Sequence, residues 1–359
     1  MSEILLTPGP TPLPDYVREA LARPIIHHRT DAYRAIFRRV AVGLPRLFHT
    51  AAPVFTLTGS GTAAMEAAVV NLLSPGEEAI VLLGGKFAER WQHLCEAYHI
   101  RAVTVPVAYG EAVDPAQVEE TLTRYPAAKV ILATLTETST GVVHDLEALG
   151  RIARAQDRIL VADAISGLGA DACRTDAWGV DVVVAASQKG LMLPPGLGFL
   201  SVNERAWKCV ERSRSPRYYN DLRLYREAAA GDDAPFTSAI PLVIALDLVL
   251  AKLNEEGIEQ VWQRTATLAA SVRAGAARLG LSVFARRPSN ALTAIAVPEA
   301  KRVVEAMHAQ GVRVAAGQGE MAGKILRIAH MGHITDSDVQ AGLKALGQAL
   351  AQVTTGAQA

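Results

Sequence analysis

The stretch Val182-Val183-Val184-Ala185-Ala186-Ser187-Gln188-Lys189-Gly190 places a lysine shortly after a short apolar run. Five small or β-branched apolar residues in a row are typical of a strand that is buried on both faces, as in a parallel sheet. A lysine at the end of such a strand is costly to remove from water unless its amine has a function. Lysines in loops are more often simply solvated, so the rest of the chain must decide between these interpretations.

On both sides of this stretch, short runs rich in Val, Ile and Leu alternate with segments of helical period. This alternation predicts an α/β fold, with three layers in which helices cover both faces of a mainly parallel sheet. Helices are expected between the strands at 62–73, 87–98, 115–124 and 146–155. The strands themselves are expected at 54–58, 79–83, 102–105, 129–134, 159–162, 182–186 and 198–202.

The length of 359 residues predicts about two domains, at roughly 150 residues each. After residue 203 the sequence becomes rich in helical patterns, and a smaller unit with strands at 291–297 and 325–328 follows. We therefore expect an N-terminal arm at 1–20, a large domain at 21–257 and a small α/β C-terminal domain at 258–359.

Charge and hydropathy exclude several classes of protein. Lys plus Arg number 36 and Asp plus Glu number 36, so no basic excess favours nucleic-acid binding. No apolar run reaches the ~18 residues that span a bilayer, and the N-terminus lacks the basic region of a signal peptide. The three scattered cysteines fit neither a disulfide framework nor a zinc site. We expect a cytoplasmic protein that binds neither nucleic acid nor membrane.

The segment Thr58–Ala64 (TGSGTAA) follows one expected strand and opens a helix. Such a turn offers backbone N–H groups, hydroxyls and the positive end of a helix dipole, which together suit a phosphate. A dinucleotide-binding turn would look similar, but it needs an acidic residue at the end of the next strand, where Leu83-Gly84-Gly85-Lys86 stands. A purely structural turn remains the other interpretation.

Asp163 follows the apolar run 159–162, at the sheet edge where α/β proteins bind ligands. It could also be a helix cap. A phosphate cradle, a carboxylate and a lysine thus all fall at carboxyl ends of strands in one sheet. Pyridoxal 5'-phosphate needs those three parts: an anchor for its phosphate, an anion facing its pyridinium nitrogen, and an amine that forms an imine with its aldehyde.

Nearly the whole chain resembles the class V (fold type I) aminotransferases, and within them the alanine/serine–glyoxylate branch. The motifs that carry the resemblance lie at 6–12 (LTPGPTP), 59–68 (GSGTAAMEAA), 137–141 (ETSTG), 161–164 (VADA), 187–190 (SQKG) and 326–328 (LRI). The resemblance implies an enzyme that uses pyridoxal 5'-phosphate to move an amino group from a small amino acid, such as alanine or serine, to glyoxylate or pyruvate.

The resemblance also implies residue roles. Lys189 would form the imine and serve as the catalytic base, and Asp163 would pair with the ring N–H. The other implied cofactor contacts are made by Ser60, Gly61 and Thr62 with Gln188 at the phosphate, Phe87 stacked on the ring, and Thr138 near the ring oxygen. From pattern alone Phe87 would rather be a core aromatic residue on a helix.

For the substrate, the resemblance implies that Arg327 holds the carboxylate, although an arginine in an edge strand could equally lie on the surface. Gly9 of the N-terminal arm would crowd the side-chain pocket, and His28 would lie at its entrance. Thr237 belongs to a segment that, in relatives, reaches the phosphate of the neighbouring subunit. The resemblance therefore implies a homodimer with shared active sites.

Three alternatives stay open. A desulfurase or related lyase shares this fold, but the desulfurases that attack sulfur directly need a cysteine in the C-terminal part, and none occurs after Cys209. A non-catalytic subunit could keep the fold as a scaffold that binds a partner. A metal site at the histidine pairs His27-His28 or His330 and His333 lacks acidic or cysteine ligands at suitable spacing, so we expect no metal.

Overall fold

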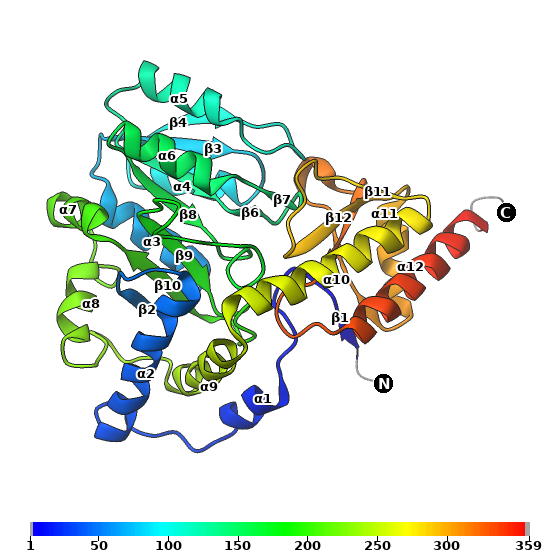
Figure 1. The fold of residues 1–359 in the computed structure, drawn as a ribbon, viewed down its shortest axis with the longest axis horizontal. Coiled ribbons are helices and arrows are strands. Elements are labelled where there is room, and N and C mark those ends of the chain that lie inside the picture. The colour runs from blue at the N-terminus through cyan, green and yellow to red at the C-terminus, as the bar shows by residue number, and fades with distance from the viewer. Residues whose placement is uncertain (1–2, 356–359) are drawn as a thin grey trace.

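The computed structural model describes residues 3–355, and its largest element is a seven-stranded sheet (Figure 1). Five strands in this sheet pair in parallel with their neighbours, and β10 alone runs antiparallel, between β2 and β9. The order across the sheet is β2 (Val54–Gly59), β10 (Gly196–Val202), β9 (Val182–Ala186), β8 (Ile159–Asp163), β5 (Val130–Thr134), β3 (Glu78–Leu83) and β4 (Arg101–Pro106). The predicted α/β fold with a mainly parallel sheet is confirmed.

Helices pack on both faces of this sheet because each central strand is apolar on both sides. In β8, Leu160 and Ala162 enter one hydrophobic core while Ile159 and Val161 enter the other, as alternate residues of a strand must. One core includes residues of α1 (Asp15–Leu21), α2 (Asp31–Phe48), α5 (Pro115–Arg124), α6 (Leu146–Ala155) and α9 (Ile240–Glu256). The other includes residues of α3 (Gly61–Leu72), α4 (Ala88–Ala97), α7 (Glu204–Arg212) and α8 (Leu222–Ala229).

A smaller unit lies at the right of Figure 1, where α10 (Ile258–Arg278) leads from the large sheet to the C-terminal part. Its antiparallel sheet has the order β11 (Ser282–Val283), β12 (Leu292–Ala296), β15 (Ile325–Ala329) and β14 (Ala315–Ala316). The helices α10, α11 (Ala300–Ala309) and α12 (Asp336–Thr355) pack against it. The expected boundary at Gly257 falls at the junction of α9 and α10; the division into two domains stays a proposal.

Five short elements complete the fold. The strands β6 (Thr136–Glu137) and β7 (Val142–Val143) form a hairpin beside the large sheet, and a 3₁₀ turn spans Gly319–Met321. The N-terminal strand β1 (Ile4–Leu5) pairs in parallel with β13 (Val312–Arg313) of the small unit. Within the described residues, no helix is long and apolar enough to cross a membrane.

The N-terminal arm joins the small unit to the loop that carries Lys189. The backbone N–H of Ala329 donates to the carbonyl of Leu6 (2.9 Å), and Leu6 is fully buried. Further along the arm, the Thr11 hydroxyl donates to the carbonyl of Lys189 (2.9 Å). The arm is therefore an integral part of the core rather than a loose extension.

Candidate active site

A cavity of about 640 Å³ lies at the carboxyl ends of β2, β8 and β9, between the large sheet and the small unit. Strand ends at this edge of an open α/β sheet are the usual place for a ligand. Ten of the residues named from the sequence line this one cavity: Gly9, Ser60, Gly61, Thr62, Phe87, Thr138, Asp163, Gln188, Lys189 and Arg327. Segments far apart in the chain thus meet in a single chemical environment.

Lys189 is 8 % exposed and lies against the N-terminal arm. Its Nζ donates a hydrogen bond to the carbonyl of Pro8. A side chain at Gly9 would collide with Lys189, since a Cβ there would lie 2.6 Å from Cδ and Cε, and the φ of +96° also favours glycine. The arm therefore closes over the lysine and leaves it little freedom to move.

Asp163 is the second buried ionisable group in the cavity, at 3 % exposure. Its Oδ1 accepts a hydrogen bond from the backbone N–H of Ile165 (2.8 Å), which leaves Oδ2 for a ligand. Burial raises the pKa of Asp163 to about 7, and nearby Arg90 and Lys189 oppose this rise. Burial lowers the pKa of Lys189 to about 8, while Asp163 acts in the opposite direction. Both groups therefore titrate near neutral pH.

The anion cradle forms at the start of α3. Ser60 occupies the N-cap position, yet its hydroxyl makes no capping hydrogen bond, and the first N–H groups of a helix have no partner within the helix. A Cβ at Gly61 would lie 2.6 Å from the Ile165 side chain, so only glycine fits there. The buried Oε1 of Gln188 has no hydrogen-bond partner among the described residues. These unused groups all line the cavity.

Phe87 and Thr138 are each held in place by a hydrogen bond to a neighbouring residue. Thr138 shares a 2.7 Å hydrogen bond between its hydroxyl and that of Ser166. The backbone N–H of Phe87 donates to the carboxylate of Glu137 (3.2 Å), at the start of α4. The Phe87 ring also receives the guanidinium of Arg90, whose Cζ is 5.2 Å from the ring centre. Phe87 is thus a cavity residue and not only a core aromatic.

Arg327 on β15 is 4 % exposed, so it is not the surface arginine that an edge strand would allow. Its Nη1 donates to the carbonyl of Thr138 (2.9 Å), and its Nη2 donates to the carbonyl of Ala316 (2.7 Å). These bonds orient the guanidinium but include no carboxylate. A planar guanidinium group held in this way is suited to binding a carboxylate through two parallel hydrogen bonds.

Two predicted residues do not line this cavity in the single chain. His28 is half-buried in the segment between α1 and α2, with its ring 4.7 Å from that of His27. Thr237 lines a separate small cavity beside Thr58 and Phe236. The role predicted for Thr237 concerns a neighbouring subunit, so its position here leaves that role a prediction.

Sequence reasoning missed several residues that line the cavity, namely Arg90, Ser166, Arg313 and Gln318. Arg90 could have been found, because it lies one helical turn after Phe87 and so shares its face of α4. Nothing in the local pattern points to Gln318, which follows a short edge strand. Among residues 3–355, no group of three or more His, Cys, Asp or Glu side chains could hold a metal ion.

A buried lysine, a buried carboxylate and the start of α3 thus meet in one cavity of an α/β fold, an arrangement that fits an enzyme site. Residues 15–341 match the family model described as aminotransferase class V. The chain therefore belongs to the class V aminotransferases, as its motifs predicted.

Three relatives place the chain within this family. It is 37 % identical to the soluble hydrogenase small subunit of Synechococcus sp., over 98 % of this chain and 93 % of that one. It is 34 % identical to the L-aspartate–glyoxylate aminotransferase of Paracoccus denitrificans, over 94 % and 89 %. The structure of a subgroup IV aspartate aminotransferase from Thermus thermophilus is 35 % identical, over 97 % and 99 %, with a TM-score of 0.90.

The pKa of about 8 makes Lys189 testable without any substrate. Only the neutral amine reacts, so reductive methylation of Lys189 should rise about tenfold per pH unit below pH 8 and then level off. Exposed lysines, with a pKa of about 10.4, should keep rising in the same digest. Peptide mass spectrometry across pH 6–11 measures both. Asp163→Asn should move the Lys189 inflection to lower pH; a wild-type inflection near 10 would contradict the assigned environment.

Proposed function

We propose that this protein uses pyridoxal 5'-phosphate to transfer the amino group of a small amino acid, such as alanine or serine, to glyoxylate or pyruvate. The observation that carries the proposal is the meeting of Lys189, Asp163 and the Ser60–Thr62 cradle in one buried cavity. Family membership supports it, since aminotransferases of this class act on amino acids and oxo acids.

Several groups that line the cavity have no partner within the described part of the protein, and they can be compared with what this cofactor needs. Where a phosphate would be held, the hydroxyl of Ser60 makes no capping hydrogen bond and the first N–H groups of α3 have no partner within the helix, so donors are available there. The free Oδ2 of Asp163 suits a ring N–H, and the side chain of Phe87 supplies an apolar surface for the ring. The residues present therefore fit pyridoxal 5'-phosphate.

When bound, the cofactor supplies an electron-accepting ring that weakens bonds at the amino acid's Cα. Asp163 would keep the ring nitrogen protonated, and Arg327 would orient the substrate carboxylate. Lys189 would tether the cofactor and, once released by the incoming amine, carry the proton between Cα and the carbon that receives the amino group. Its lowered pKa supports that role, because a base that works at neutral pH must lose its proton readily.

Two other functions fit less well. The chain has no cysteine after Cys209, so a desulfurase that attacks sulfur through its own thiol is disfavoured. A non-catalytic scaffold, which the similarity to a hydrogenase subunit keeps open, has no need of a buried lysine and carboxylate in one cavity. If the protein shows no absorbance band near the edge of the visible range after reconstitution with the cofactor, the non-catalytic scaffold function would be favoured.

Asp163→Ala is expected to retain the fold and lose transamination by about a hundredfold or more, within the range for a group that controls proton transfer. The assay follows alanine and glyoxylate to pyruvate and glycine, with circular dichroism as the check on folding. Lys189→Ala should abolish the absorbance band of the tethered cofactor. Near-normal turnover in Asp163→Ala would refute its role as counter-ion of the ring.

One observation favours a second donor, aspartate. Arg90 lines the cavity, and within the described residues its side chain makes no hydrogen bond or ion pair. The cavity therefore holds a second guanidinium group that is not paired with a carboxylate. The aspartate aminotransferase names of two relatives agree with this choice. A dicarboxylic donor would then place one carboxylate at Arg327 and the other at Arg90.

A donor panel separates these substrates. Arg327→Gln should raise the KM for every amino acid by about tenfold or more, since a charge-assisted hydrogen bond is lost, while cofactor absorbance survives. Arg90→Gln should weaken only aspartate if that residue binds its side chain. Equal effects of Arg90→Gln on alanine, serine and aspartate would exclude the dicarboxylic interpretation, and loss of cofactor binding in Arg327→Gln would show that residue to be misassigned.

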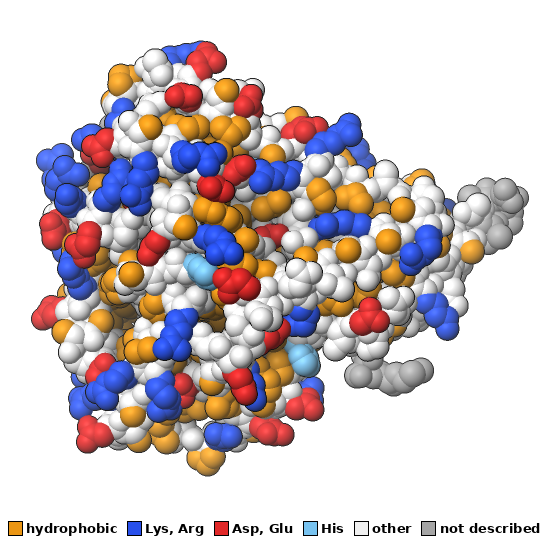
Figure 2. All heavy atoms as spheres, in the orientation of Figure 1, with side chains coloured by type: hydrophobic (Ala, Val, Ile, Leu, Met, Phe, Trp, Pro, Cys, Tyr) orange, Lys and Arg blue, Asp and Glu red, His pale blue; other side chains and the backbone are white. Residues whose placement is uncertain are grey.

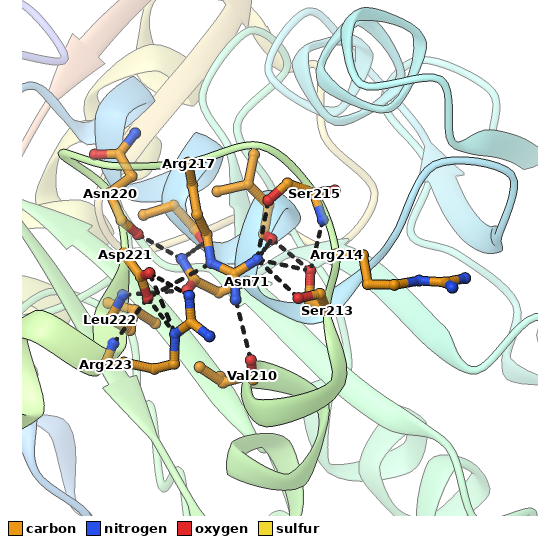
Figure 3. A network of polar contacts seen from close by, with 12 residues as sticks. Asn71, Val210, Ser213, Arg214, Ser215, Arg217, Asn220, Asp221, Leu222 and Arg223 are labelled. Atoms are coloured by element: carbon orange, nitrogen blue, oxygen red, sulfur yellow. Dashed lines mark hydrogen bonds and ion pairs between the residues drawn. The ribbon is translucent and has the colours of Figure 1, made fainter.

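We also propose that the protein is a cytoplasmic homodimer with shared active sites. The loop after α7 supports the dimer, because a network of polar contacts orders this loop (Figure 3). Arg217 donates to the carbonyls of Val70 (3.2 Å) and Val210 (3.1 Å), and Asn71 donates to the carbonyl of Asn220 (2.6 Å). Tyr218 is 75 % exposed on this ordered loop, which suits contact with a second copy.

Complementation tests the shared site. Thr237→Val should weaken cofactor binding, and Lys189→Ala should lose the tethered absorbance. Mixed under exchange, the two variants should regain native sites, because a Thr237→Val chain with its own Lys189 would receive the intact Thr237 of its partner. No recovery in the mixture, or a monomer in analytical ultracentrifugation, would contradict sharing. Tyr218→Glu should favour the monomer, while Leu279→Glu on the small unit serves as the charge control.

A further inference from the structure

A second cavity, of about 400 Å³, lies at the opposite edge of the large sheet from the candidate active site. It forms where β5 and β8 begin and where α7 packs beside them. Of its eight lining residues, one is acidic (Asp157) and five are cationic: Lys129, Arg158, Arg205, Lys208 and Arg212. In Figure 2, Lys and Arg side chains gather near α7, at the left of the view.

Of the five cations, Arg205 is paired with carboxylates, and the other four have no carboxylate partner within the described residues. In the described residues, the side chains of Lys129 and Lys208 make no hydrogen bond or ion pair. Arg212 donates only to the carbonyl of Lys208 (3.0 Å) and weakly to the thiol of Cys209. Like charges held this close repel one another, so an anion from outside would relieve the repulsion.

Two of the arginines that line the cavity are held by contacts with the rest of the protein. Arg205 is paired with Asp181 (3.0 Å) and with Asp157 (3.3 Å), and it also donates to the carbonyl of Arg158 (3.0 Å). Arg158 donates through Nη2 to the carbonyl of Pro126 (3.1 Å), while its Nε is buried without a partner among residues 3–355. Arg205 and Arg158 are thus held by the protein, and three further cations, Lys129, Lys208 and Arg212, have no carboxylate partner among residues 3–355. Together they line one cavity.

We propose that this basic cavity binds the diphosphate group of a small anion. Its volume suits a small molecule rather than a polymer, and several phosphate oxygens are needed to meet five cations. No aromatic side chain lines it, so a nucleobase would find no stacking surface there. The shared chemistry of inorganic pyrophosphate and a nucleoside diphosphate is therefore what the site recognises.

Isothermal titration of the cofactor-loaded protein with pyrophosphate, ADP and sulfate tests the proposal, at one ionic strength. Pyrophosphate is expected to bind and to raise the unfolding temperature, because a ligand that binds only the folded state stabilises it. The double variant Lys208→Ala/Arg212→Ala should bind at least about tenfold more weakly, since it loses two charge-assisted contacts. The control Lys301→Ala/Lys344→Ala removes the same charge from exposed positions on α11 and α12 and should bind like wild type.

Each outcome is decisive. Equal binding of pyrophosphate and ADP supports recognition of the diphosphate, whereas binding of ADP without pyrophosphate overturns it. Sulfate binding as tight as pyrophosphate would reduce the site to general charge screening and overturn the proposal. Unchanged affinity in Lys208→Ala/Arg212→Ala, or an equal loss in the control variant, would place the anion elsewhere. Transamination by the double variant should be unchanged, which separates this site from the proposed function.

Discussion

The buried carboxylate of Glu137 is the interaction on which the geometry of the candidate active site depends. Fully buried, it accepts hydrogen bonds from the backbone N–H groups of Ala88 (3.0 Å) and Ser139 (3.0 Å), and so fixes the start of α4 to the β6–β7 hairpin. Phe87 is placed by the first of these contacts, and Thr138 lies between the hairpin residues that make the second. Gly85 must be glycine, since a Cβ there would lie 2.4 Å from the Glu137 side chain. Burial raises the pKa of Glu137, and these hydrogen bonds oppose the rise.

A second carboxylate, Asp171, connects the large sheet to the small unit. It accepts hydrogen bonds from the Thr136 hydroxyl (2.7 Å), the Ser289 hydroxyl (2.5 Å) and the N–H of Asn290 (2.7 Å). The strand that follows, β12, pairs with β15 and places Ala294 opposite Arg327. Arg327 then reaches back to the carbonyl of Thr138 (2.9 Å). The position of the guanidinium therefore depends on two buried carboxylates, Glu137 on the β6–β7 hairpin and Asp171 in the loop after β8.

Sequence reasoning located the cavity residues that lie at strand ends, and their roles stay predictions. Lys189 and Asp163 could be found because parallel strands end at one edge, and Gly61 because a helix opens there. It overlooked Arg90, which the helical spacing from Phe87 could have indicated, and it could not find Gln318, whose position depends on how an edge-strand loop packs across the cavity. The basic cavity was missed for the same reason, because its five cations come from the starts of two strands and from a helix. The net charge of the chain is zero, so the composition gave no sign of a local cluster of cations.

The two central groups of the site show why a ligand belongs there. Burial is the largest contribution to the rise in the pKa of Asp163 to about 7 and to the fall in the pKa of Lys189 to about 8, so the cavity disfavours both charges. A cationic N–H placed at the free oxygen of Asp163 would favour the carboxylate and return its pKa towards the usual range. An imine at Lys189 would remove the need to bury an ammonium group. A molecule with both features would therefore offset the cost of burying these two groups.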